Sequence, residues 1–166
     1  MQEENGSTSP RSRKSRSSSE QTPVQRALGM LVRREHSRKE LARKLNARGI
    51  DAEAADAAIE RLSNAGLQDD GRFAESLTRT RANAGYGPVR IRVELATHGL
   101  EPGVIDAVLA EFAGEWIERA RHLLTRRFDR KRLAELSIKR KAMGLLIRRG
   151  FDGDTIRTVL DVESGD

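Results

Sequence analysis

Basic side chains are concentrated in one stretch near the C-terminal end of the chain, and they are its clearest candidates for binding chemistry. Between residues 119 and 149 the sequence holds 12 basic and two acidic side chains, a net charge of +10 in a chain whose total is +6. Most are arginines, whose planar guanidinium pairs with carboxylates and phosphates. Self-repulsion of so much like charge opposes compaction, which favours a role in meeting an anionic surface. The alternatives are a solvated helix face and, for Arg148 and Arg149, a favourable place at a helix C-terminus. The predicted partner-binding patch comprises Arg119, Arg121, Arg126, Arg127, Arg130, Lys131, Arg132, Lys139, Arg140, Lys141, Arg148 and Arg149.

The acidic and imidazole side chains show no catalytic or metal-binding pattern. Asp69 and Asp70 precede an expected helix, where carboxylates cap free backbone N–H groups. His36, His98 and His122 are far apart in sequence, so surface or capping roles are expected. The chain has no cysteine, and neither a GxxxxGK[ST] nor a GxGxxG motif. We therefore predict a non-enzyme with no cofactor and no bound metal.

The aromatic side chains are too few for a base-stacking sheet surface, since there are four Phe, one Tyr and one Trp. Tyr86 stands between two glycines and is the aromatic residue expected to be most exposed. The others are expected in the core: Phe73, Phe112, Trp116, Phe128 and Phe151.

An internal repeat indicates which elements position these residues. Residues 37–50, 87–100 and 138–151 each contain an apolar residue, another four positions later, a glycine four positions after that, and then a large apolar residue. A glycine with φ > 0 is a common helix end, so each segment predicts a helix that stops at Gly49, Gly99 or Gly150. Apolar residues at helical spacing also precede and follow each segment. The sequence therefore predicts an all-α fold of three tandem three-helix repeats, stacked on a continuous core into an elongated curved body.

Capping residues support the same helices. Ser37 is expected to be an N-cap, with Glu40 three residues on completing a capping box. Pro88 suits the first helical turn, where a missing N–H costs nothing. Acidic residues after the three glycines are expected near the start of the next helix; these are Asp51, Glu101 and Asp152.

Residues 89–95 alternate between apolar and charged side chains, which is typical of a half-buried strand. The repeat nevertheless aligns Ile91 and Leu95 with Leu41 and Leu45. We therefore predict a helix there, with Val89 and Val93 on its flank.

The domain organisation follows from composition. Residues 1–23 are Ser-rich and nearly devoid of apolar side chains, which predicts a disordered tail. The three repeats are expected at 24–66, 67–114 and 115–163. No apolar run approaches the roughly 20 residues that span a membrane, and no signal-peptide core is present. We expect a soluble cytoplasmic monomer.

Several motifs together resemble the RecX family, over about residues 24–160. The first is Leu31-Val32-Arg33-Arg34-Glu35-His36-Ser37 with Glu40-Leu41 and Lys44-Leu45. The second is Gly66-Leu67-Gln68-Asp69-Asp70 with Phe73-Ala74. The third is Gly85-Tyr86-Gly87-Pro88 with Ile91 and Glu94-Leu95, and the third repeat ends with Arg148-Arg149-Gly150-Phe151.

The resemblance implies a regulator that binds RecA and RecA–DNA filaments and inhibits ATP hydrolysis, strand exchange and coprotease activity. It also implies that the turn of Gly85, Tyr86, Gly87 and Arg90 could touch the partner, although Tyr86 replaces a basic residue that is frequent in relatives. An alternative hypothesis is a helical DNA-binding protein that acts without RecA. A third is a helical-repeat adaptor for another protein.

Overall fold

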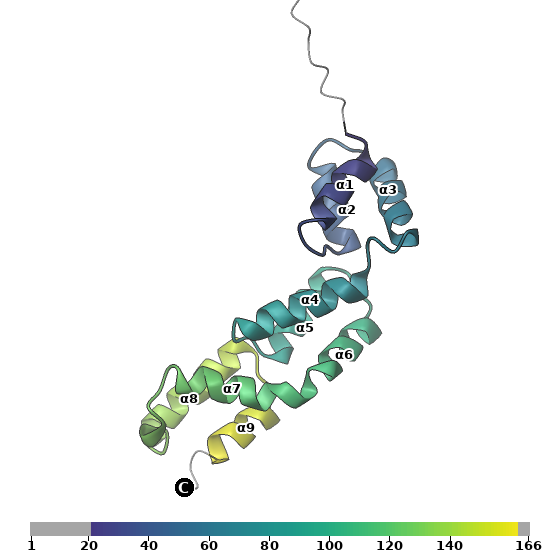
Figure 1. Cartoon of the computed structure of the whole chain (residues 1–166). Coiled ribbons are helices and arrows are strands. Elements are labelled where there is room, and N and C mark those ends of the chain that lie inside the picture. Colours follow the sequence, from purple (N-terminus) through teal and green to yellow (C-terminus); the bar gives the residue numbers. More distant parts are fainter. Residues whose placement is uncertain (1–20, 163–166) are drawn as a thin grey trace, which may run out of the picture.

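The computed structural model describes residues 21–162, which form nine α-helices, two short 3-10 helices and no strand (Figure 1). The predicted all-α fold is confirmed, and residues 1–20 of the predicted tail lie outside the described part. The α-helices are α1 (Pro23–Leu31), α2 (Arg38–Asn46), α3 (Ala52–Asn64), α4 (Asp70–Asn83), α5 (Pro88–Thr97), α6 (Pro102–Glu111), α7 (Trp116–Thr125), α8 (Leu136–Arg149) and α9 (Gly153–Val162). The 3-10 helices are η1 (Ala113–Glu115) and η2 (Arg130–Arg132).

Each repeat is one three-helix unit: repeat one is α1–α3, repeat two is α4–α6 and repeat three is α7–α9. Within each unit the first helix packs on the third, and the units follow one another along an elongated body (Figure 1). The predicted glycines all have positive φ, with values of 81° at Gly49, 75° at Gly99 and 81° at Gly150. The apolar residues that precede them are buried, which confirms the helix ends; these are Leu41, Leu45, Ile91, Leu95, Ala142 and Leu146.

Most of the predicted caps are present. The side chains of Ser37, Asp51 and Asp152 accept hydrogen bonds from backbone N–H groups three residues on. Glu101 stands at the N-cap position of α6 but makes no such bond. The capping box predicted at Ser37 is wrong, because the Glu40 carboxylate is bound by Arg34 and Lys44 instead.

The segment that alternates between apolar and charged residues is helical, as the repeat predicted. Pro88 begins α5, and Ile91 and Leu95 are fully buried on its inner face. The alternate valines do not face a core, since Val89 is 49% and Val93 is 62% exposed. The strand-like pattern therefore reflects apolar residues on the solvent face of a helix.

The expectation of one continuous core is wrong at the first repeat. One apolar cluster, which includes Ala27, Leu41 and Ile59, lies entirely within repeat one. A second cluster runs from Phe73 in α4 to Leu160 in α9 and joins repeats two and three. Repeat one is therefore a separately packed unit, and repeats two and three share a hydrophobic interior.

Polar contacts connect repeat one to repeat two. The Asp70 carboxylate accepts a hydrogen bond of 2.9 Å from the Arg38 backbone N–H and so caps α2 from the neighbouring repeat. The buried Gln68 amide donates to the same carboxylate. The buried Ser37 hydroxyl lies 3.0 Å from Nδ1 of His98, whose ring packs on Phe73. The carboxylate and hydroxyl that cap α2 therefore also hold the two repeats together.

A buried ionic cluster lies at the N-terminal end of α2, and its histidine contradicts the expected surface role. His36 is only 3% exposed; its Nδ1 donates to the Arg34 carbonyl, and its Nε2 accepts from Lys44. Burial lowers the pKa of His36, which keeps the ring neutral. Burial would raise the pKa of Glu40, but hydrogen bonds from Arg34 and Lys44 outweigh it and lower that pKa to about 2.

These shifts predict a loss of stability in acid. His36 has a lowered pKa in the folded chain, so the unfolded chain takes up more protons below the ordinary value of 6.5 and stability falls from there downward. The contribution of Glu40 is complete above its ordinary pKa of 4.5 and is lost as the pH falls towards 2. Replacing Glu40 by Gln should lower the free energy of unfolding near neutral pH by up to about 3 kcal/mol.

The measurement is urea unfolding, followed by far-ultraviolet circular dichroism, at a series of pH values between about 7 and 3. Glu111→Gln, at an exposed residue on α6, is the matched control and should behave as wild type. Equal stability of Glu40→Gln and the control at neutral pH would contradict the assigned role of the cluster.

Candidate partner-binding surface at the junction of repeats two and three

Two glycines bring the backbones of repeats two and three into direct contact. The backbone N–H of Gly87 donates to the Arg149 carbonyl at 2.8 Å, and that of Val89 donates to the Gly150 carbonyl at 2.9 Å. A Cβ at Gly87 would collide with the carbonyl group of Gly150, and a Cβ at Gly150 would collide with Arg90. We call this contact the glycine junction. It fixes the start of α5 against the end of α8.

Tyr86 lies in the same turn and is held between two arginines. The guanidinium carbons of Arg90 and Arg149 lie 4.8 and 5.0 Å from the centre of its ring, within the range of cation–π attraction. Arg149 also donates to the Ala84 carbonyl at 3.2 Å. Tyr86 is half-buried, because Arg149, 63 positions away in the sequence, covers one side of its ring.

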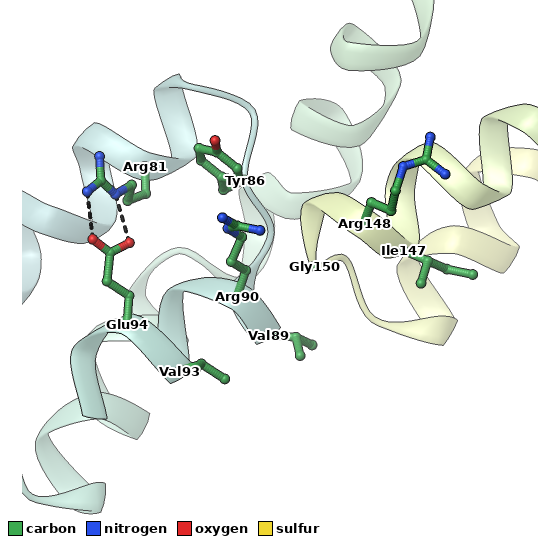
Figure 2. Close-up of a pocket in the computed structure, with 9 residues that line it drawn as sticks. All are labelled: Arg81, Tyr86, Val89, Arg90, Val93, Glu94, Ile147, Arg148 and Gly150. Atoms are coloured by element: carbon green, nitrogen blue, oxygen red, sulfur yellow. Dashed lines mark hydrogen bonds and ion pairs between the residues drawn. The ribbon is translucent and has the colours of Figure 1, made fainter. Parts of the chain in front are cut away.

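Beside the glycine junction lies a groove of about 650 Å³ between α5 and α8, which Gly150 helps to line and which we call the α5–α8 groove (Figure 2). Three exposed aliphatic side chains line it, with exposed fractions of 49% at Val89, 62% at Val93 and 59% at Ile147. Charged groups complete its lining: Arg90, Arg148, and an ion pair of Arg81 with Glu94.

The Arg81–Glu94 ion pair is bidentate, with nitrogen–oxygen distances of 2.6 and 2.8 Å (Figure 2). Hydrogen bonds from Arg81 lower the pKa of Glu94, and the same bonds raise the pKa of the guanidinium. Both groups therefore stay charged, and they satisfy each other. The groove keeps a positive balance, because Arg90 and Arg148 form no ion pair with another residue of 21–162.

Several residues of the predicted basic patch are neutralised within the chain. Arg119 binds Glu115 and Arg121 binds Glu118, each one turn away on or just before α7. Arg132 in η2 pairs with Glu135, just before α8. Lys139 on α8 pairs with Asp161 on α9. The net charge of +10 along the sequence is thus partly offset in space.

A second group of patch residues is exposed and forms no ion pair within the described chain. Its members are Arg126, Arg127, Lys131, Arg140, Lys141 and Arg148. Arg126 and Arg127 directly follow α7 and line a second cavity of about 710 Å³, together with Arg119 and Arg149. Arg130 begins η2 and is exposed beside them. The patch therefore presents cations on two faces: the α5–α8 groove, and the end of α7.

Sequence reasoning missed the aliphatic side chains of the groove. The sequence predicts Val89 and Val93 on the flank of a helix and does not single out Ile147. Their i, i+4 spacing on α5 was a usable signal, because apolar residues on a solvent-facing flank are unexplained by the fold. No group of three or more His, Asp or Glu in residues 21–162 is placed to hold a metal, and no helix there could cross a membrane.

The fold and this surface define a class: tandem three-helix domains with an arginine-rich face. Residues 24–62, 69–109 and 114–160 match, in order, the first, second and third three-helix domains of RecX. The chain belongs to the RecX family of regulatory proteins.

Curated relatives support this membership along most of the chain. The regulatory protein RecX of Stenotrophomonas maltophilia strain K279a is 57% identical over 138 residues, 83% of this chain and 85% of that protein. The regulatory protein RecX of Xanthomonas campestris pv. campestris strain B100 is 56% identical over 156 residues, 93% of this chain and 96% of that protein.

Solved structures share the fold. The crystal structure of RecX from Lactobacillus salivarius has a TM-score of 0.72 at 24% identity and covers 85% of this chain and 94% of that one. A second crystal structure, of a regulatory protein RecX, has a TM-score of 0.69 at 24% identity and covers 84% of this chain and 70% of that one.

The glycine junction yields a prediction with a built-in control. Gly49 and Gly150 both have φ of 81°, but a Cβ at Gly49 meets open space. Gly49→Ala should therefore lower the free energy of unfolding by only about 1–2 kcal/mol, the strain of placing a Cβ in the left-handed backbone region. Gly150→Ala should cost at least about twice as much, because repeats two and three must also move apart. Urea unfolding measures both, and equal losses would show that the glycine junction contributes no stability.

Proposed function

We propose that this protein is a non-enzymatic regulator that binds RecA filaments on DNA and inhibits their ATP hydrolysis, strand exchange and coprotease activity. The observation that carries the proposal is the match of three successive domains to RecX, along with relatives named regulatory proteins. We expect it to act as a cytoplasmic monomer.

The shape and charge of the chain support a filament as the partner. Three units in line give an elongated body (Figure 1), which suits a long repetitive surface better than a compact one. The exposed Arg126, Arg127, Arg140 and Lys141, which form no ion pair within residues 21–162, can meet DNA phosphates or acidic side chains of the filament. Because repeats two and three share a core, the helices that carry these cations are packed into one body.

A second candidate function is DNA binding without RecA. The exposed Arg126 and Arg127, which form no ion pair within the described chain, favour it. Comparing the affinity for bare single-stranded DNA with that for the RecA filament distinguishes the two functions. Binding to bare single-stranded DNA should be weak and fall steeply with salt if the filament is the true partner. DNA binding that equals or exceeds filament binding would favour the second function.

The test is a titration of full-length protein into RecA assembled on single-stranded DNA, with ATP hydrolysis as the readout. We expect hydrolysis to fall at amounts well below one molecule per RecA, since blocking one site on a filament affects its neighbours. Bovine serum albumin at equal concentration controls for non-specific effects. Unchanged hydrolysis at saturating protein would contradict the proposal.

Reversing two charges tests the part of the patch at the end of α7. Arg126→Glu with Arg127→Glu should raise the half-inhibitory concentration by about tenfold, because losing two charge contacts costs a few kcal/mol before screening. The helical circular dichroism should not change, since neither side chain forms an ion pair in the described chain. Arg43→Glu on α2 is the matched control, and an equal loss in it would exclude a local role for Arg126 and Arg127.

A further inference from the structure

We propose that the α5–α8 groove is a docking site for an amphipathic, acidic peptide segment of the protein partner. The inference rests on the proposed function and adds to it, because it assigns a protein contact to a surface separate from the cations at the end of α7. The predicted occupant presents two or three aliphatic side chains on one side and carboxylates at the edge.

The aliphatic lining is the first reason. Val89 and Val93 lie one turn apart on α5, and Ile147 lies across the groove on α8 (Figure 2). Each is about half exposed or more in the described part of the chain. Burying such side chains against a partner is favourable by about 25 cal/mol per Å² of apolar area. A phosphate backbone offers no apolar surface to match them.

The charge of the rim is the second reason. Among the ionic groups that line the groove, Glu94 is paired with Arg81, whereas Arg90 and Arg148 form no ion pair with any residue in the described part of the chain. Arg90 is also oriented by its stacking on Tyr86. A segment with carboxylates flanking its apolar residues complements this lining, whereas a basic segment is repelled.

The fixed placement of the two helices that form the groove is the third reason. The backbone hydrogen bonds of the glycine junction hold α5 and α8 at a fixed separation. The two walls come from residues 88–97 and 136–149, so the groove exists only when repeats two and three are assembled. A preformed groove loses little entropy on binding, which favours recognition of a short segment.

The experiment compares full-length variants in three assays: inhibition of RecA ATPase, binding of a fluorescent single-stranded oligonucleotide, and sedimentation of the protein alone. Val93→Ser with Ile147→Ser removes two of the three exposed aliphatic side chains of the lining, and Arg148→Glu reverses a rim charge. The matched controls are Val32→Ser, at a valine that is 80% exposed in repeat one, and Arg43→Glu. Circular dichroism verifies that each variant is folded.

We expect the groove variants to raise the half-inhibitory concentration by about tenfold or more, because one or two aliphatic contacts with the partner are lost. Oligonucleotide binding should stay at the wild-type level in Val93→Ser with Ile147→Ser, and the controls should inhibit normally. A photo-crosslinker introduced at position 93 should then attach to a RecA peptide that contains acidic residues.

Other outcomes overturn the inference in distinguishable ways. Normal inhibition by the groove variants, with an inhibitory wild type, rejects the groove and keeps the proposed function. A parallel loss of oligonucleotide binding, or a crosslink to DNA, makes the groove a nucleic-acid contact. A wild-type dimer that the variants convert to monomer makes a second copy the occupant. A wild type that never inhibits RecA rejects both proposals.

Discussion

The backbone contact between Gly87 and Gly150 is the constraint on which the rest of the surface depends. Neither position has room for a side chain, and each backbone supplies one partner of the hydrogen bonds that join repeat two to repeat three. This approach puts α5 beside α8, lets Arg149 reach the face of Tyr86, and creates the α5–α8 groove above it. The two glycines at which an added Cβ would collide with the neighbouring repeat therefore both lie where repeats two and three meet.

Repeat one is joined to repeat two by polar contacts, whereas repeat two is joined to repeat three by a shared apolar core. Repeats two and three share an apolar interior as well as the glycine junction, so they form one body. Repeat one has its own core and is attached through polar groups, among them Asp70, Gln68 and the Ser37–His98 contact. When two repeats separate, their polar groups can form hydrogen bonds to water instead, so the net loss of free energy is small. Separating repeats that share an apolar core would expose that core to water, which costs much more. Any change of shape along the chain is therefore expected between repeats one and two.

Much of the fold could be read from local spacing, because helix ends and caps are decided within a few residues. Gly49, Gly99 and Gly150 ended their helices as predicted, and the repeat overrode the strand-like alternation around Val93. Contacts between distant residues could not be read. His36 was expected at the surface or at a cap, yet it is buried beside Lys44, and the residues around Tyr86 do not show that Arg149 covers its ring. The basic patch was visible as charge, but its internal ion pairs and the groove beside it depend on the approach of α5 to α8.

We infer that the partner binds to the joined surface of repeats two and three. Hydroxyl-radical footprinting of the full chain, free and on RecA–DNA filaments, tests it most directly, because it reports the exposure of individual side chains. The account predicts that labelling of Val89, Val93, Ile147 and Arg148 falls on the filament, while the exposed Val32 of repeat one is labelled as before. Unchanged labelling of the groove residues in a saturated complex would contradict it.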